Sequence, residues 1–213
     1  MTRGRFITFE GGEGSGKSTQ IPRLAARLKD HGVGVIVTRE PGGTPGGEAI
    51  RRLLVEGEAG RWDPMSEALL NFAARRQHLI ETIWPALDRG DWVLSDRFAD
   101  STMAYQGYGH RLGREAIDAL YRASVGSFHP DLTLIFDLPV ELGLKRAGIR
   151  GGGEDRYERL GAEFHERVRE GLLEIARREP KRCRVIDASR DVDAVEGAVT
   201  RAVEGALNLA LSS

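Results

Sequence analysis

The chain has 213 residues, a formal net charge of −1 and a hydrophobic content of 40%, which is ordinary for one globular domain. This charge balance predicts no general attraction to nucleic acid or to membranes, and no apolar run reaches the length of a membrane-spanning helix. The single cysteine, Cys183, excludes an intramolecular disulfide. Together with the lack of a signal-peptide pattern at the start, it favours a cytoplasmic protein.

Hydrophobic periodicity divides the chain into alternating strands and helices. Strands are predicted at residues 5–10, 33–38, 91–96, 131–137 and 183–187. Helices are predicted at about residues 17–31, 46–57, 64–88, 113–125, 139–148, 157–178 and 191–209. We expect Pro22 to bend the first helix and Pro85 to bend or end the third. The alternation predicts an α/β fold, a five-stranded parallel sheet with helices on both faces, in a single domain over residues 1–213.

Charged residues gather where three of the predicted strands end. Glu10 ends the first strand, residues 38–40 follow the second, and Asp96 and Arg97 follow the third. Ligands of open parallel sheets bind beyond the carboxyl ends of the strands. We therefore expect these three loops to converge on one crevice.

A glycine-rich loop follows the first strand and fits the phosphate-binding pattern G-x-x-x-x-G-K-[ST] in full. Its residues are Gly11, Gly12, Glu13, Gly14, Ser15, Gly16, Lys17 and Ser18. Glycines allow backbone N–H groups to surround phosphate oxygens, and the helix that follows directs its positive end at the same anion. Lys17 supplies a mobile charge, and the Ser18 hydroxyl is a ligand that Mg²⁺ prefers. A plain glycine-rich turn is the alternative, but the preceding strand and the amphipathic helix afterwards favour ATP binding.

Two weaker features bear on phosphate chemistry. The Asp96 carboxylate suits Mg²⁺ and the Arg97 guanidinium suits a phosphate, although an ion pair at a strand end would look the same. Arg146, Arg150 and Arg156 bracket the glycines at 151–153. This spacing fits a lid that closes over a transferring phosphoryl group, and it fits a solvated loop equally well.

Five stretches together resemble the bacterial thymidylate kinases, which are P-loop nucleoside monophosphate kinases. They are FEGGEGSGKSTQ, TREPGGTPGGEAIR, FAARRQHL, SDRFADSTMAYQG and LKRAGIR…DRYE, and the likeness extends over roughly residues 4–190. The resemblance implies a P-loop kinase fold with a short arginine-bearing lid at about residues 146–157. It implies a homodimer that uses ATP and Mg²⁺ to convert dTMP to dTDP.

The same resemblance assigns roles to individual residues. Catalytic roles fall on Lys17, Arg97, Arg150 and Arg156, and the metal is expected at Ser18 and Asp96. The ATP phosphates are expected on the glycine-rich loop, residues 11–18. The dTMP site is expected to comprise Glu13 at the sugar, Arg39, Arg51 and Arg97 at the phosphate, Tyr105 against the deoxyribose, and Ser101, Thr102 and Gln106 on the base side.

The contact with the thymine ring has two possible alignments. An ungapped match puts Asn71 at an aromatic position of the family and Arg75 at an arginine that reaches O4, whereas a shift by one residue gives Phe72 and Arg76. Either pair shares one helix face. We favour Arg75 for O4 with Phe72 close to the base, although core packing also explains Phe72.

Two residues depart from relatives of the family. Gly14 stands where eukaryotic members have arginine, so the resemblance moves that charge to the lid. Leu172 stands where relatives often have tyrosine, and we infer no substitute for it.

Two other functions remain open at this stage. One is a kinase for another nucleoside monophosphate or for a deoxynucleoside. The other is a P-loop switch or scaffold that binds nucleotide without this chemistry. A second group of phosphate-binding arginines argues against the switch, because a switch has no second phosphate to hold.

Overall fold

The computed structural model describes residues 3–58, 60–150, 156–157, 159–207 and 209–211, without the side chains of residues 149 and 150. Within this part of the chain, five parallel strands form one sheet in the order β2-β3-β1-β4-β5. The strands are β1 (Phe6–Gly11), β2 (Val35–Arg39), β3 (Trp92–Asp96), β4 (Leu132–Asp137) and β5 (Cys183–Asp187). The predicted five-stranded parallel sheet is confirmed.

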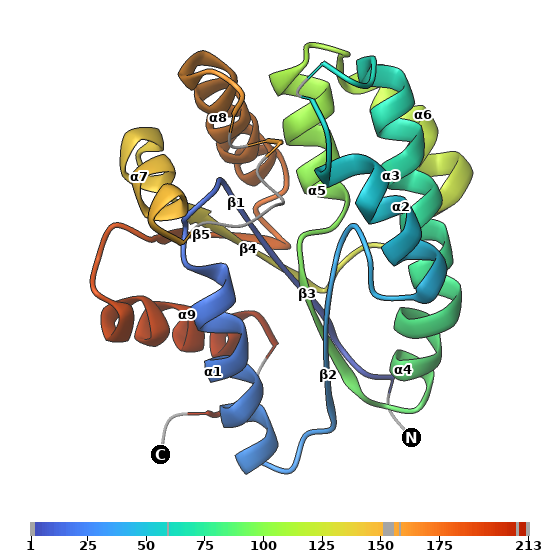
Figure 1. Ribbon diagram of the computed structural model, residues 1–213. Coiled ribbons are helices and arrows are strands. Elements are labelled where there is room, and N and C mark those ends of the chain that lie inside the picture. Colours follow the sequence, from blue (N-terminus) through green and yellow to red (C-terminus); the bar gives the residue numbers. More distant parts are fainter. Residues whose placement is uncertain (1–2, 59, 151–155, 158, 208, 212–213) are drawn as a thin grey trace.

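Helices alternate with these strands along the chain (Figure 1). The α-helices are α1 (Lys17–Asp30), α2 (Pro45–Val55), α3 (Pro64–His78), α4 (Trp84–Asp88), α5 (Ala99–Thr102), α6 (Arg114–Ser124), α7 (Val140–Arg150), α8 (Ala162–Arg178) and α9 (Val192–Leu207). Two π-helical segments continue helices directly, namely η1 (Leu79–Ile83) and η2 (Met103–Gly109). No helix in the described residues is long and apolar enough to span a membrane.

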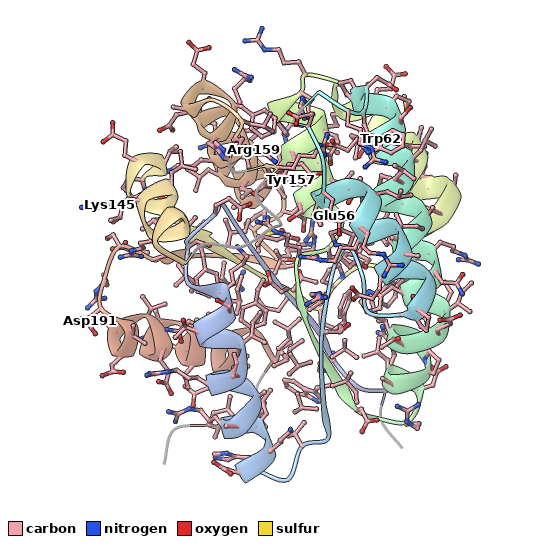
Figure 2. All side chains as sticks on the ribbon, viewed as in Figure 1. Glu56, Trp62, Lys145, Tyr157, Arg159 and Asp191 are labelled. Atoms are coloured by element: carbon pink, nitrogen blue, oxygen red, sulfur yellow. The ribbon has the colours of Figure 1, made fainter. Side chains whose placement is uncertain are left out.

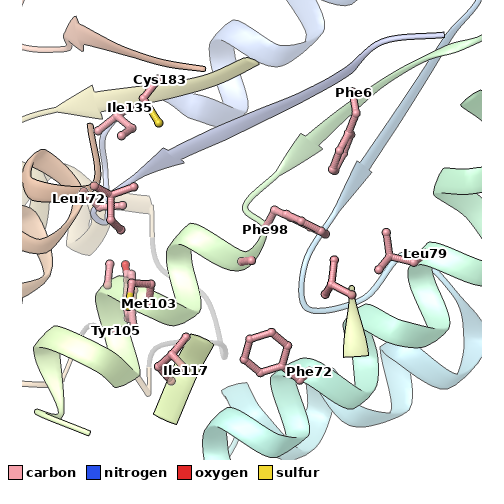
Figure 3. Close-up of a cluster of buried hydrophobic side chains, with 14 of the residues drawn as sticks. Phe6, Phe72, Leu79, Phe98, Met103, Tyr105, Ile117, Ile135, Leu172 and Cys183 are labelled. Carbon is pink, nitrogen blue, oxygen red and sulfur yellow. The ribbon is translucent and has the colours of Figure 1, made fainter. Parts of the chain in front are cut away.

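The alternation of side chains along the strands builds two separate cores. Phe6 of β1 enters the core shared with α3, α6 and α8, which is the cluster in Figure 3. Its neighbours Ile7 and Phe9 enter the opposite core against α1 and α9. Successive residues of a strand point to opposite faces. Glu10 therefore shares the face of Phe6 and points towards the helices of the first core.

The long predicted helix at 64–88 is present but changes its hydrogen-bonding pattern before Pro85. The chain passes from α3 through the π-helical η1 into α4 without leaving the helical path. Proline has no N–H to donate to the carbonyl four residues earlier, and a wider π turn is one way to accommodate this loss. Pro85 thus interrupts the α-helical pattern without ending the rod.

Sequence periodicity missed the helical segment at 99–109, and it began α8 five residues early, at 157 instead of 162. Close packing between η2 and α8 explains the missed segment. A Cβ at Gly109 would lie 2.6 Å from the Phe164 ring, and one at Gly171 would lie 2.7 Å from the Tyr108 ring. Glycines weaken a helical pattern in sequence, but here they allow two helices to approach closely.

Candidate active site

The glycine-rich loop lies between β1 and α1, with its lysine turned back into the loop. Lys17 is 7% exposed, and its Nζ donates to the carbonyls of Gly11 and Gly12 and to Ser15 Oγ, each at 3.1 Å. Burial, followed by the positive charge of Arg97, lowers the pKa of Lys17 to about 8. Gly14 and Gly16 have φ values of 66° and 89°, which only glycine adopts without strain. The loop has the shape and charge of a phosphate cradle.

Arg97 connects this loop to the end of β3. Its Nη2 donates to Glu13 Oε1 at 2.8 Å and its Nη1 to the Gly11 carbonyl at 3.1 Å. Arg97 has a φ of 70°, in the left-handed region that non-glycine residues rarely occupy. This conformation turns the guanidinium towards the loop. Strained backbone of this kind concentrates at functional sites.

A carboxylate faces Arg97 across the site. Glu13 Oε1 accepts from Arg97 and, at 2.8 Å, from the Tyr105 hydroxyl. Burial acts to raise the pKa of Glu13, but Arg97, Lys17 and the tyrosine hydroxyl outweigh it and hold that pKa below its usual value. The cluster thus keeps an ionised acceptor between two donors.

One cavity of about 110 Å³ collects most of the expected substrate contacts. Eight of the residues expected in the dTMP site line it, namely Glu13, Arg51, Arg75, Arg97, Ser101, Thr102, Tyr105 and Gln106. They come from the glycine-rich loop, α2, α3, the β3–α5 loop and the α5–η2 segment. The loops after the strands converge here, as we expected from the positions of the charged residues.

Arg39 and Phe72 are two expected contacts that lie outside this cavity. The Arg39 side chain is 53% exposed and pairs with Glu48 at 3.0 Å, beside a second cavity lined by Ser18 and Asp96. Phe72 is 3% exposed and belongs to the apolar core. The ring supports Arg75, whose guanidinium carbon lies 4.7 Å from the ring centre, and core packing describes Phe72 best.

The ungapped alignment fits the structure better than the shifted one. Asn71 and Arg75 both line the cavity, whereas Arg76 is exposed and donates to the Ser124 carbonyl at 3.2 Å. Arg75 is held by Glu40 at 2.8 Å and by Thr102 at 3.0 Å. Its Nη1 is buried and has no hydrogen-bond partner among the described residues. A buried donor without a partner is costly, so Nη1 is an atom prepared for a ligand.

The second cavity brings together the two expected metal ligands. Ser18 and Asp96 both line it, and Asp96 Oδ1 is buried without a hydrogen-bond partner in the described part of the chain. Mg²⁺ commonly takes only one or two protein oxygens and completes its shell with water and phosphate. A hydroxyl and an orphaned carboxylate oxygen beside the phosphate cradle fit that requirement.

The expected lid arginines are placed differently from one another. Arg150 ends α7, and its side chain lies outside the described residues, as do residues 151–155. Arg156 is 2% exposed; it donates to the carbonyls of Leu54 and Glu58 and pairs with Glu67. It is therefore held at α2 and α3. The neighbouring residues Tyr157 and Arg159 are labelled in Figure 2, and Arg159 donates to the Gly57 carbonyl.

Sequence reasoning placed Glu10 and Glu40 at the ends of strands but gave them no partners, and it missed the buried Glu67 altogether. Glu40 accepts from Arg75 and, at 3.0 Å, is bonded to His78. Glu67 begins a stripe of buried polar residues on α3, continued by Asn71, Arg75 and His78. The spacing of four, four and three residues was a readable signal, because such residues share one helix face.

Leu172 packs in the core and lines a small cavity beside the glycine-rich loop, together with Gly12, Glu13 and His165. The wall of this cavity is mainly apolar around Leu172. The structure supplies no hydroxyl at that position in place of the tyrosine of relatives.

Comparisons with known proteins agree with this geometry. The family model described as thymidylate kinase matches residues 9–199. A thymidylate kinase of Caulobacter vibrioides is 59% identical over 209 residues, covering 98% of this chain and 100% of that protein. One of Alkalilimnicola ehrlichii is 50% identical, covering 100% and 98%. The crystal structure of thymidylate kinase from Ehrlichia chaffeensis superposes with a TM-score of 0.76 at 37% identity, covering 93% of this chain and 98% of that one. These matches extend along nearly the whole chain and agree with the P-loop fold and the two cavities beside the glycine-rich loop. The chain belongs to the thymidylate kinase family.

Proposed function

We propose that this chain transfers the γ-phosphoryl group of ATP to dTMP, giving dTDP and ADP. The observation that carries the proposal is the cavity beside the glycine-rich loop, where Arg51 and Arg97 can hold a phosphate and Arg75 offers a free donor. The full-length relatives named thymidylate kinase support it independently.

On the donor side, the glycine-rich loop holds the ATP phosphates. Lys17 exchanges its contacts with the loop carbonyls for phosphate oxygens, because a buried ammonium gains more from an anion than from neutral carbonyls. Ser18 and Asp96 hold the Mg²⁺ that accompanies ATP. When bound, the ion offsets charge on the β and γ phosphates.

On the acceptor side, arginines bind the monoester and polar groups read the nucleoside. Arg51 and Arg97 suit a dianionic phosphate. Glu13 and Tyr105 face the deoxyribose, where the tyrosine ring leaves little room for a 2′-hydroxyl. Arg75 Nη1 donates to O4 of the base, and Ser101, Thr102 and Gln106 complete the base side.

The mechanism relies on position and charge. The dTMP phosphate is already ionised at neutral pH, so the attacking oxygen needs no strong general base. Lys17 and Arg97 both donate to the Gly11 carbonyl, which supports a shared role in stabilising the charge that spreads over the transferring group. We retain Arg150 as the lid arginine, whereas the position of Arg156 supports a role on the acceptor side.

The exposed side of α3 supports association of two copies, as the family resemblance implies. Met65, Leu69 and Ile80 lie along α3 and η1 and are 37%, 49% and 47% exposed, while the polar stripe of the same helix is buried. A helix that buries its polar side and exposes apolar side chains presents an apolar surface that a binding partner can cover. A second copy of α3 is the partner that we propose.

Formation of ADP from MgATP, with and without an acceptor, tests the function. We expect turnover that depends strongly on dTMP, is weaker with dUMP and is absent with thymidine. Loss of the 5-methyl contact costs only about 1–3 kcal/mol, so dUMP remains a real substrate. Turnover that is indifferent to all three would leave a nucleotide-binding switch, and a preference for AMP or dCMP would indicate a different monophosphate kinase.

A further inference from the structure

A buried carboxylate lies behind the base end of the cavity and is absent from the mechanism above. Glu67 of α3 is 1% exposed. Its Oε1 accepts from Gln106 Nε2 at 2.6 Å and lies 3.6 Å from His110 Nε2. Its Oε2 pairs with the Arg156 guanidinium. Glu67 therefore links α3, η2 and Arg156, near the end of the segment expected to form the lid.

The chemistry of this contact fixes the direction of the Gln106 amide. A carboxylate accepts hydrogen bonds and has none to donate, whereas an amide has a donor nitrogen on one side and an acceptor oxygen on the other. The nitrogen must therefore face Glu67. Gln106 lines the cavity, and because its nitrogen donates to Glu67, its Oε1 is the amide atom left to accept from a ligand.

The lining of the cavity therefore offers one donor and one acceptor to a base. Arg75 Nη1 is the free donor, and Gln106 Oε1 is the free acceptor. Thymine and uracil present the complementary pair, the O4 carbonyl and the N3–H group. Cytosine presents the reverse, an amino group at C4 and an unprotonated N3, which would meet Arg75 and Gln106 with like groups facing each other.

We propose that Glu67 is a positioning residue that selects against cytosine by fixing the Gln106 amide with its oxygen towards the base. The proposal rests on the proposed function and names how its base site distinguishes pyrimidines. Arg156 supports Glu67 in this role. Its guanidinium pairs with the Glu67 carboxylate and donates to the carbonyls of Leu54 and Glu58, so it holds the carboxylate in place.

The test is the substitution Glu67→Gln, which keeps the shape but allows the side chain at 67 to donate as well as accept. The Gln106 amide can then turn over. We expect the ratio of kcat/KM for dTMP to that for dCMP to fall at least about tenfold, the effect of one reversed hydrogen bond. The ratio for dTMP to dUMP should stay unchanged, because both bases carry N3–H.

Glu81→Gln is the matched control, because Glu81 also accepts from a glutamine, Gln77, but on the exposed surface of the same helical rod. It should leave both ratios at their wild-type values. A folded Glu67→Gln protein with the wild-type ratio of dTMP to dCMP would overturn the proposal. Equal losses for all three nucleotides would do so too, because they would reveal only structural damage.

The double variant Glu67→Gln/Gln106→Glu reverses the pair and provides a rescue. The amide introduced at position 67 would donate to one oxygen of the carboxylate introduced at position 106, and the other oxygen would again face N3–H. We expect the preference for dTMP over dCMP to return to within about tenfold of wild type. This variant also decides the matter if Glu67→Gln alone fails to fold, and a double variant without that preference would refute the proposal. A wild-type protein inactive with dTMP would instead refute the proposed function.

Discussion

At the scale of single residues, the site depends on charged groups that are buried and held by neighbours. Lys17 rests on loop carbonyls, Arg97 on Glu13, and Arg75 on Glu40. Burying such groups is costly unless each has a partner. Their partners therefore fix where each charge stands before any ligand arrives, which is the preorganisation that phosphoryl transfer needs.

Arg97→Ala tests this role directly. Loss of a preorganised guanidinium next to the transferring group should raise the barrier by about 2–4 kcal/mol, seen mainly in kcat. Arg76→Ala, which removes an exposed arginine bonded to the Ser124 carbonyl, should leave kcat near its wild-type value. Steady-state kinetics with dTMP would compare the two. Equal effects at both positions would contradict the assignment of Arg97.

Glu10→Gln should change how stability depends on pH. Burial, reinforced by Asp100, raises the pKa of Glu10 from 4.5 to about 8. Between these values the folded protein holds this proton more tightly than the unfolded chain does. Wild-type stability should therefore fall as pH rises through this window, by up to ~1.4 kcal/mol per pH unit.

Glutamine carries no such proton, so its variant should lack this contribution to the slope. Urea unfolding at several pH values across the window would measure the free energy of unfolding of both proteins. The exposed Glu81→Gln serves as the control and should follow the wild type. Parallel pH profiles for Glu10→Gln and wild type would show that Glu10 does not bind the proton preferentially in the folded state.

At the scale of elements, close approach of α7 to the glycine-rich loop shapes the donor side. A Cβ at Gly143 would lie 2.5 Å from the Glu13 carbonyl, and one at Gly14 would lie 2.1 Å from the Gly143 carbonyl. These distances are too short for any side chain. Glycine at both positions therefore lets a helix support the loop from behind.

Gly143→Ala should push α7 away from the loop, lower the melting temperature and raise the KM for ATP. Gly148→Ala is the control on the same helix, because a Cβ there meets nothing within 4 Å. It should stabilise the protein slightly, since alanine favours a helix by up to about 1 kcal/mol over glycine. If both variants behaved alike, the close contact with the loop would not be what requires glycine at 143.

Elements whose structure depends on neighbouring residues in the sequence were predicted accurately, whereas an element that depends on a distant packing partner was missed. The strand at 183–187 agrees residue for residue, because a short segment with adjacent β-branched residues between turns is a local pattern. The segment at 99–109 was missed because its helical form depends on packing against α8, where Gly109 meets Phe164. Propensity alone cannot report a partner that is distant in sequence.

At the scale of the whole molecule, the exposed apolar side of α3 predicts a homodimer. Leu69→Glu should convert the dimer to a monomer, because it places a charge in the apolar surface that the second copy would cover. Val192→Glu is the control, since Val192 is similarly exposed, at 45%, but begins α9. Light scattering after size-exclusion chromatography would give both masses. A Leu69→Glu protein that remained dimeric would locate the interface elsewhere.

The sequence by itself determined the phosphate cradle, the parallel sheet and the family of this protein, because each of these features depends on residues that are adjacent in the sequence. The loop at 11–18 carries its own geometry in its glycines and in the strand and helix around it. The family resemblance named Arg51, Arg75 and Arg97 as contacts of one substrate, and all three line one cavity.

Only the tertiary structure decided which polar residues share an environment. It placed Arg39 and Arg51 beside different cavities and Phe72 in the core. It also brought Glu67 to Gln106 and Arg156 from positions far apart in the chain. The physical reason is that a buried charge is tolerated only where packing supplies its partner, and that partner comes from whichever element the fold sets beside it.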